Sequence, residues 1–267
     1  MNNKKLSIII VNYNGIQYLK DCLESIKKYC SLVSYEVIMV DNLSIDGSQS
    51  YIKENYSEVI LIENEYNLGF SKANNLGVKH AKGEIILLLN NDTILLNDFS
   101  PLLKVIKRID VGAIGIKMLN SNKEYVHSFG KFPKPMKLLK LTNLNETRRD
   151  LITGNFTKSE YQVDWISGSF ILVTKEDWNL VNGMDEDYFM YVEDVDFCKR
   201  LRNNNKQILF YPSFDYVHFV GFSLKREFKL IQGYKTYSNK HFSLIGKTNA
   251  NLMLAINVLY KKIVRKI

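Results

Sequence analysis

Short apolar runs alternate with helix-like segments through the first 120 residues, and this alternation constrains the fold more than any other feature of the chain. Each apolar run is continuous and rich in Ile, Val and Leu, which is typical of a strand buried on both faces. Strands separated by helices favour βαβ units, so we expect an α/β fold with a mostly parallel sheet flanked by helices. The predicted strands span residues 6–12, 36–41, 59–63, 84–90 and 113–118, and the predicted helices span residues 16–29, 48–56, 71–81 and 97–109.

The middle of the chain has a different character. Residues 120–161 lose periodicity and carry Pro133, Pro135 and many Lys, Asn and Thr residues, which predicts a long irregular insertion. Regular patterns then return. They predict a strand over 165–174, a helix over 175–182, a helix from about 192 and a strand over 207–211.

The C-terminal part differs again, because it is basic and helical. Leu252, Ile256, Leu259 and Ile263 form an apolar stripe, and Lys and Arg residues crowd the end of the chain. We therefore expect one main domain over residues 1–223 and a basic helical extension over residues 224–267.

Composition limits the classes of function. The chain has 267 residues, of which 46% are hydrophobic, so it can bury a full core. A formal charge of +8 and a pI near 9.1 indicate an anionic partner: nucleic acid, a nucleotide or an acidic membrane surface. A nucleic-acid-binding protein would concentrate its cations on one groove-facing element with exposed aromatics. Here we expect the charge to spread along the chain, with some excess at the C-terminus, so no nucleic-acid partner is predicted.

Cysteine usage and hydropathy point to a setting without disulfides or membrane spans. The three cysteines lack CxxC spacing and the four histidines are scattered, which indicates neither a disulfide framework nor a structural zinc site. A reducing cytosol is the expected setting. The apolar run at residues 6–11 is too short for a signal peptide, and no segment reaches about 18 uninterrupted apolar residues. We predict no transmembrane span.

Polar residues follow several of the predicted strands. In a parallel sheet the carboxyl ends of the strands meet at one edge, where ligands bind. Asn and Asp are also common in loops and at helix N-caps, but their repetition favours a binding crevice. No GxGxxG or P-loop motif follows the first strand, so a divalent cation is one way to hold an anionic ligand. The polar ends are residues 12–14, 41–42, 64 and 90–92.

Three carboxylates, Glu193, Asp194 and Asp196, lie among aromatic residues just before three cations. Carboxylates in a largely apolar segment are costly unless they are solvated, paired, hydrogen-bonded or bound to metal. General-base catalysis is one role for such a group, and a solvated helix start is the alternative. Asp92, beyond the strand over 84–90, is the best candidate metal ligand, with a turn or N-cap aspartate as the alternative. His218 is the second candidate, although a lone His among apolar residues is more often a core residue.

The chain resembles the inverting family 2 glycosyltransferases of the GT-A fold, in the branch that contains bacterial rhamnosyltransferases and related cell-surface polysaccharide enzymes. The resemblance spans roughly residues 6–223 and implies a Rossmann-like sheet. It rests on four segments in this order: SIIIVNYN at 7–14, VDNLSIDGS at 40–48, NLGFSKANNLG at 67–77 and GMDEDYFMYVEDVD at 183–196.

The resemblance implies a donor pocket in the first half of the chain. Asp41 is similar to the family aspartate that contacts the nucleoside of the sugar donor, with Asn12 and Tyr13 lining the same pocket. An N-cap role is the other explanation for Asp41, and plain turn chemistry is the other explanation for the glycines of the third segment. The residues implied to close over or line the donor are Asn67, Gly69, Asn74 and Asn91.

The resemblance also implies a metal site for Mg²⁺ or Mn²⁺. The family has an Asp-x-Asp-like element after the fourth strand, and here residues 90–92 read Asn-Asn-Asp, so Asp92 is the implied ligand and an amide replaces the first carboxylate. This replacement leaves open how tightly the metal binds without nucleotide. His218, followed by Gly221 and Ser223, resembles the second metal-binding element.

Asp194 matches the catalytic base of the family, with Glu193 beside it. It would take a proton from the acceptor hydroxyl as that oxygen attacks the anomeric carbon opposite the leaving diphosphate. Asp196 is implied to be a supporting or acceptor-side residue. Trp165, in the acceptor-side strand, could stack on a sugar or belong to the core.

The implied activity is transfer of a sugar from a nucleoside-diphosphate donor, first dTDP-rhamnose and next a UDP-hexose or UDP-N-acetylhexosamine, to a glycan or lipid-linked oligosaccharide acceptor. A sugar-phosphate nucleotidyltransferase is the alternative enzyme, but it needs a Gly- and Arg/Lys-rich loop after the first strand, which residues 12–15 do not supply. The basic C-terminal helix is predicted to rest on an anionic membrane surface at the inner face of the cell membrane, or to pack on the domain or on a second copy in a homodimer.

Overall fold

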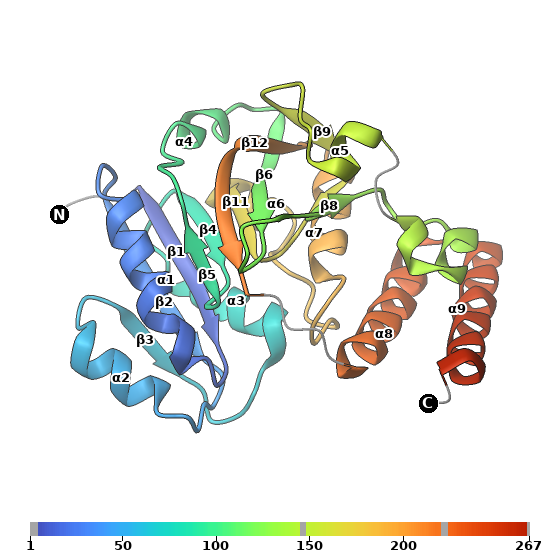
Figure 1. Cartoon of the computed structure of the whole chain (residues 1–267), viewed down its shortest axis with the longest axis horizontal. Coiled ribbons are helices and arrows are strands. Elements are labelled where there is room, and N and C mark those ends of the chain that lie inside the picture. The colour runs from blue at the N-terminus through green and yellow to red at the C-terminus, as the bar shows by residue number, and fades with distance from the viewer. Residues whose placement is uncertain (1–4, 145–147, 220–223, 266–267) are drawn as a thin grey trace.

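The computed structural model describes residues 5–144, 148–219 and 224–265 (Figure 1). Its centre is a mixed sheet with the strand order β3-β2-β1-β4-β11-β6-β12-β5. The first four of these strands are parallel, β11 runs antiparallel between β4 and β6, and β12 is parallel to β6, so the predicted mostly parallel α/β sheet is confirmed. The strands are β1 Leu6–Asn12, β2 Tyr35–Asp41, β3 Ile60–Glu63, β4 Ile85–Leu89, β5 Thr93–Leu95, β6 Val111–Leu119, β7 Tyr125–Val126, β8 Phe129–Gly130, β9 Tyr161–Val163, β10 Trp165–Ile166, β11 Phe170–Thr174 and β12 Gln207–His218.

Helices cover both faces of the sheet, because the strands are apolar on both sides. One buried cluster joins the sheet to α1, α2 and α4, and a second joins the opposite face to α3, α6 and α7. β4 shows the reason: Leu87 belongs to the first cluster and its neighbours Ile86 and Leu88 belong to the second. The helices are α1 Ile16–Tyr29, α2 Ser48–Asn55, α3 Gly69–His80, α4 Leu102–Val105, α5 Arg149–Thr153, α6 Lys175–Leu180, α7 Glu193–Asn203, α8 Leu224–His241 and α9 Leu244–Arg265, with 3₁₀ turns η1 Pro135–Leu139 and η2 Leu141–Leu144.

A predicted helix and a predicted strand extend further than the elements observed. The helix predicted over 97–109 shrinks to α4, because Asp98 accepts the Ser100 N–H over 2.7 Å in a turn and Pro101 starts the helix only after it. The strand predicted over 165–174 breaks into β10 and β11 at residues 167–169. Small residues occupy that break, and its backbone contacts α7 instead of continuing the sheet.

Among its described residues, 120–144 and 148–161, the predicted irregular insertion contains short elements, β7, β8, η1, η2 and α5. The strand predicted over 207–211 continues to His218, with a shift of register between Tyr211 and Asp215. This longer β12 brings His218 opposite Thr93 of β5.

The extension consists of α8 and α9, which form the right-hand side of the molecule in Figure 1. A third buried cluster joins them to η1, η2 and the start of α7. The predicted domain division at residue 223 falls in the segment 220–223, which lies outside the described residues, and stays a prediction. Within the part of the chain that the structure describes, no helix has the length and apolar character needed to cross a membrane.

Candidate active site

The predicted donor residues at the ends of β1, β2 and β4 form one hydrogen-bonded cluster. Register pairs Asn12 with Asp41, so their side chains meet at the carboxyl end of the sheet. Nδ2 of Asn12 donates to Oδ2 of Asp41 over 2.7 Å, and Nδ2 of Asn91 donates to Oδ1 of Asn12 over 2.6 Å. The structure therefore brings together three residues that are far apart in sequence.

Asp41 is fully buried, and its charge is stabilised by further donors. Its Oδ1 accepts the backbone N–H of Ser44 over 2.8 Å and Nε2 of Gln49 over 2.7 Å. A buried carboxylate is tolerated when hydrogen bonds replace its hydration. Asp41 thus fixes the shape of the loop between β2 and α2, and Tyr13 lies exposed beside it, with 54% of its surface accessible.

Gly15 allows the close approach of this cluster. A Cβ at this position would lie 2.0 Å from Nδ2 of Asn91 and 2.7 Å from Oδ1 of Asn12. A side chain at position 15 would therefore displace the amides of Asn91 and Asn12 from this arrangement.

The segment that the resemblance assigns to nucleotide closure forms the start of α3. Oδ1 of Asn67 accepts the N–H of Gly69 over 2.9 Å, and Gly69 has φ of +78°. Asn74 is buried and donates to the Phe70 carbonyl over 2.9 Å, while Asn42 donates to the Gly69 carbonyl over 3.1 Å. These three predicted residues shape the segment, and their contact with a donor stays a prediction.

Asp92 and His218 lie side by side, as the candidate metal site requires. Nε2 of His218 is 3.1 Å from Oδ1 of Asp92 and 3.1 Å from Nδ2 of Asn90. One imidazole nitrogen carries either an N–H or a lone pair, so it cannot donate to the carboxylate and accept from the amide at once. Oδ1 of Asn90 is buried and has no hydrogen-bond partner among the described residues.

This donor set fits Mg²⁺ or Mn²⁺. A carboxylate, an imidazole and an amide oxygen suit such an ion, which usually completes its shell with substrate phosphates and water. No group of three or more His, Cys, Asp and Glu residues that could hold a metal occurs in the described ranges. The protein ligands are therefore few, and Gly221 and Ser223 of the predicted second element lie outside the described residues.

Asp194 lies at the start of α7, held by two backbone groups. Its Oδ2 accepts the Gly168 N–H over 2.9 Å and its Oδ1 accepts the Val195 N–H over 2.8 Å. The preceding Tyr191 and Val192 both have φ of +73°, which a β-branched residue rarely adopts. Such strain often marks a functional site, because the surrounding structure must hold it in place.

Glu193 is more deeply buried than Asp194, with 5% of its surface accessible. Burial, and then the charge of Asp194, raises the pKa of Glu193 well above its ordinary value. Its Oε2 has no hydrogen-bond partner among the described residues. Glu193 therefore holds its proton to higher pH than an ordinary glutamate, which leaves Asp194 as the better-placed proton acceptor of the two.

Asp196 points to the protein interior and joins α7 to α8. Its Oδ2 accepts from Nε of Arg200 and its Oδ1 accepts from Nε2 of His241, each over 2.7 Å. Burial alone would favour the protonated form, but the bonds from His241 and Arg200 outweigh it and lower the pKa of Asp196. The side chain is 1% exposed, which favours a structural role, and the acceptor role of Asp196 stays a prediction.

Trp165 packs between the second and third buried clusters. Its indole N–H donates to the Lys131 carbonyl over 3.0 Å, and its ring lies against Gly130. This packing favours the alternative that Trp165 belongs to the core. Stacking of Trp165 on an acceptor sugar stays a prediction.

The turn at residues 167–169 connects the candidate base to the candidate metal ligands. Gly168 bonds Asp194, and the next residue, Ser169, accepts the Asn90 N–H over 3.1 Å. Asn90 in turn contacts His218. The ring of Phe70, from the nucleotide-closure segment, lies 3.2 Å from where a Gly168 Cβ would stand. Predicted base, metal and donor residues thus meet at one end of the sheet.

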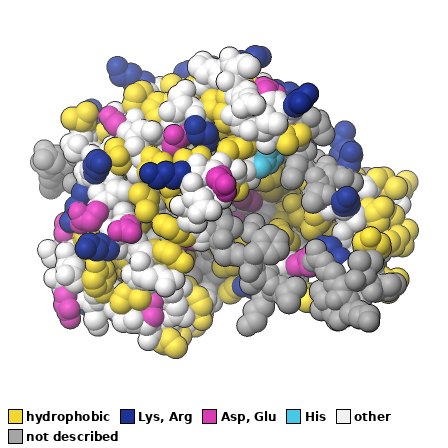
Figure 2. Space-filling view, in the orientation of Figure 1, with side chains coloured by type: hydrophobic (Ala, Val, Ile, Leu, Met, Phe, Trp, Pro, Cys, Tyr) yellow, Lys and Arg dark blue, Asp and Glu magenta, His cyan; other side chains and the backbone are white. Residues whose placement is uncertain are grey.

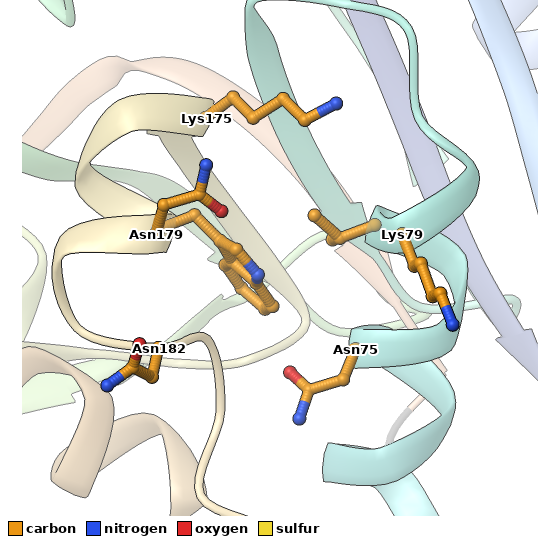
Figure 3. A pocket seen from close by; sticks show the side chains of 7 residues that line it. Asn75, Lys79, Lys175, Asn179 and Asn182 are labelled. Atoms are coloured by element: carbon orange, nitrogen blue, oxygen red, sulfur yellow. The ribbon is translucent and has the colours of Figure 1, made fainter.

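A cavity of about 350 Å³ lies elsewhere, between α3 and α6 (Figure 3). Its rim carries Lys79 and Lys175, but Lys175 already donates to the Ala81 carbonyl over 2.6 Å. No predicted site residue lines it, so it is separate from the candidate active site. Its lining residues are Asn75, Val78, Lys79, Lys175, Trp178, Asn179 and Asn182.

Two residues that shape the site were not predicted from the sequence. Gln49 bonds Asp41, and His241 bonds Asp196. Asn90, which lies at one of the predicted polar strand ends, contacts His218. No sequence pattern links His241 to a carboxylate 45 residues earlier.

Comparison with protein families decides the class of this protein. Residues 7–164 match the model "Glycosyl transferase family 2", and residues 151–223 match "N-terminal domain of galactosyltransferase". The chain belongs to glycosyltransferase family 2. The predicted family and its enzyme class are thereby confirmed.

Curated relatives agree with this assignment. Rhamnosyltransferase WbbL of Escherichia coli (strain K12) is 28% identical over 90% of this chain and 97% of its own length. Low-salt glycan biosynthesis hexosyltransferase Agl10 of Haloferax volcanii is 26% identical over 76% of this chain and 63% of its own length. N-acetylglucosaminyl-diphospho-decaprenol L-rhamnosyltransferase of Mycobacterium tuberculosis is 41% identical, over 26% of this chain and 22% of its own length.

Solved structures confirm the GT-A fold. GalNAc-T7 with UDP, GalNAc and Mn²⁺ is similar with a TM-score of 0.64 and 16% identity, over 83% of this chain and 44% of that protein. Mannosyltransferase PcManGT from Pyrobaculum calidifontis, in complex with GDP-Man and Mn²⁺, has a TM-score of 0.63 and 16% identity, over 99% of this chain and 76% of its own. Identities this low support the fold and nothing finer.

Proposed function

We propose that this glycosyltransferase is inverting and moves a sugar from a nucleoside-diphosphate donor to a glycan or lipid-linked acceptor in cell-surface polysaccharide synthesis. The observation that carries the proposal is the turn at 167–169. It bonds Asp194 on one side and Asn90, next to the Asp92–His218 pair, on the other. A proton acceptor and a set of groups suited to a diphosphate and its cation therefore stand at one end of the sheet.

The proposed chemistry follows from the side chains present. Asp194, oriented by the Gly168 N–H, takes the proton from the acceptor hydroxyl as that oxygen attacks the anomeric carbon. Attack opposite the leaving diphosphate inverts the configuration. Burial and the charge of Asp194 raise the pKa of Glu193, which favours the neutral form of Glu193 beside Asp194. The cluster of Asn12, Asp41 and Asn91 fixes the pocket for the nucleoside, with Tyr13 exposed at its rim.

Asp92, His218 and the amide oxygen of Asn90 would hold Mg²⁺ or Mn²⁺. When bound, the cation would offset the charge that grows on the departing diphosphate. The same residues would position the diphosphate end of the donor. The loop after β4 is held against the end of β12, because the Phe219 N–H donates to the Asp92 carbonyl over 3.0 Å.

For the donor we propose dTDP-rhamnose first, followed by a UDP-hexose or UDP-N-acetylhexosamine. Two of the relatives are rhamnosyltransferases by name, and one acts on a diphospho-decaprenol-linked sugar by name. The second of these names supports a lipid-linked acceptor. A membrane surface and a second copy of the chain are both proposed partners of the extension.

A panel of nucleotide sugars with Mn²⁺ tests the proposal. We expect slow donor hydrolysis, or transfer to an added acceptor, with one donor, and EDTA should abolish it. Asp92→Ala should abolish the same signal, whereas His80→Asn, at an exposed histidine of α3, should leave it unchanged. Activity that survives both EDTA and Asp92→Ala contradicts the metal-assisted mechanism, and hydrolysis of no donor contradicts the proposed donor class.

A further inference from the structure

α9 has apolar side chains on two opposite sides. One side packs on the rest of the protein: Ala250, Met253 and Leu254 are buried in the third cluster, and Nδ2 of Asn257 donates to the Leu139 carbonyl over 2.7 Å. This side recurs at intervals of three and four residues, as expected for a helix face that meets the core. The helix therefore has its partner within the protein already.

The opposite side of α9 is exposed to solvent. Leu252 is 54% exposed, Ile256 is 39% exposed and Leu259 is 58% exposed, and the same spacing of four and three residues places them on one face. The predicted stripe is real but points away from the protein, and the side chain of Ile263 lies outside the described residues. Figure 2 shows hydrophobic side chains gathered along the edge that α9 forms in Figure 1. Further exposed apolar residues on or beside this helix are Leu244, Ile245 and Tyr260.

An apolar groove of about 280 Å³ borders this face, between α8 and α9. Leu254, Ala255, Val258 and Leu259 line it, and Lys235 of α8 stands at its edge. Helix α9 spans 22 residues, which corresponds to about 33 Å. The exposed face thus offers a long apolar surface with a cation beside it.

The net charge of the chain resides in the extension. Residues 224–267 contain ten Lys and Arg residues and one acidic residue, whereas the rest of the chain contains 26 Lys and Arg against 27 Asp and Glu. The Lys and Arg residues spread along the chain with an excess at the C-terminus, as expected, but only in the extension do they outnumber the acidic residues. The one acidic residue, Glu227, is bonded by Lys261 of α9. The exposed apolar face is thus carried by the most basic part of the molecule.

Charge indicates whether a second copy of the chain or a membrane surface covers the exposed apolar face of α9. A second copy of the chain would bring an equally basic extension to the same contact, and like charges oppose such pairing. A bilayer surface with anionic lipids offers negative charge and an apolar layer together, which is what an interfacial amphipathic helix requires. We propose that α9 lies in the surface of an anionic membrane, with Leu252, Ile256 and Leu259 at the acyl boundary.

Vesicle co-sedimentation of the full chain tests this proposal without any assay of transfer, so its outcome is independent of the proposed function. We expect binding to vesicles of phosphatidylcholine mixed with phosphatidylglycerol, weaker binding to pure phosphatidylcholine, and a decline as salt rises. The double variant Leu252→Asp with Leu259→Asp should bind the mixed vesicles at least about tenfold more weakly. The control pair Leu32→Asp with Ile109→Asp, at residues 83% and 90% exposed elsewhere, should bind as wild type.

Both pairs lie at exposed positions, so thermal unfolding should show that each variant is folded. Unchanged vesicle binding by the Leu252/Leu259 variant overturns the proposal. Equal binding of wild type to neutral and anionic vesicles also overturns it. Light scattering provides the third outcome: a wild-type dimer that the same variant converts to monomer shows that a second copy covers the face.

Discussion

Two regions of the site hold their carboxylates in opposite ways. The first is the cluster of Asn12, Asp41 and Asn91, called here the donor-side cluster after the predicted sugar donor. The second is residues 191–194, called the acidic turn before α7. Asp41 is buried among donors from Asn12, Ser44 and Gln49, so its charge is balanced locally. Glu193 and Asp194 follow a strained backbone, and one buried oxygen of Glu193 has no partner among the described residues. The first arrangement fixes the loop after β2, whereas the second holds Asp194 by two backbone N–H groups beside a glutamate whose pKa is raised by burial.

The two regions also differ in what supports them. The donor-side cluster draws on the ends of neighbouring parallel strands. The acidic turn depends on α8: Gly233 packs on the Tyr191 carbonyl, and His241 bonds Asp196. Lys240 of α8 also bonds Asp185 over 2.8 Å and Asp187 over 2.6 Å. The C-terminal extension is therefore part of the structure that positions the proposed base.

The largest stability effect is expected at the donor-side cluster. Asp41→Ala removes the acceptor of one buried donor, Asn12, and of two partly buried donors, Ser44 and Gln49, and should cost about 3 to 5 kcal/mol of unfolding free energy, since each unsatisfied group costs about 1 to 3 kcal/mol. Urea unfolding measures this. Asp110→Ala, at a surface carboxylate bonded by Arg108, should change little, and an equally small effect at Asp41 would contradict the view that its hydrogen bonds fix the pocket.

A somewhat smaller effect is expected at the link between α7 and α8. Asp196→Ala leaves Arg200 and His241 without their carboxylate and should cost about 2 to 3 kcal/mol, whereas Asp185→Ala should cost less than about 1 kcal/mol. Because the folded pKa of Asp196 is lowered, its contribution is present above its unfolded pKa, at about 4, and is lost as pH falls through the folded value.

Unfolding free energy measured against pH checks this link. Wild type should lose stability in acid more steeply than Asp196→Asn, which lacks this titration. Glu193 has the opposite sign: its raised pKa makes its contribution fall as pH rises, so Glu193→Gln should gain relative to wild type towards alkaline pH. Parallel curves for the three proteins would show that these carboxylates do not titrate as described.

The contact between α8 and the strained turn predicts a smaller loss of unfolding free energy when it is disturbed. Gly233→Ala would place a Cβ 2.6 Å from the Tyr191 carbonyl oxygen and should cost about 1 to 2 kcal/mol through overpacking. Gly246→Ala in α9, whose nearest contact is a Phe242 side-chain atom at 3.1 Å, serves as the matched control and should be neutral or stabilising. If Gly233→Ala keeps full stability and transfer, α8 does not hold the turn.

The smallest effect is expected at the metal candidates. Asn90→Asp adds a carboxylate beside Asp92 and His218 and should tighten Mn²⁺ binding without nucleotide by about tenfold, because Mn²⁺ prefers charged oxygen ligands. Calorimetry of the free protein measures this, and Asn55→Asp at the surface controls for added charge. No gain at Asn90 would show that its side chain does not face the cation.

Much of the donor side could be predicted from the sequence, because consecutive parallel strands bring their polar ends together. Asn12 and Asp41 lie where the strand pattern places them. The acidic side could not be predicted in the same way. The bond between His241 and Asp196 and the turn at Gly168 depend on tertiary packing between segments that no local periodicity relates. The apolar stripe on α9 could be recognised from the sequence. Whether the stripe faces the protein or the solvent could not, because that depends on which side of α9 packs on α8.

The most direct test of the account is transfer by Asp194→Asn, measured with the nucleotide sugar that the donor panel selects. The account predicts a loss of about two or more orders of magnitude in turnover, the usual scale for a general base, with donor affinity nearly unchanged. Glu193→Gln, next to it, should retain most of the activity, because Glu193, whose pKa is raised by burial, is not the proposed proton acceptor. Wild-type turnover by Asp194→Asn would contradict the assignment of Asp194 as the base.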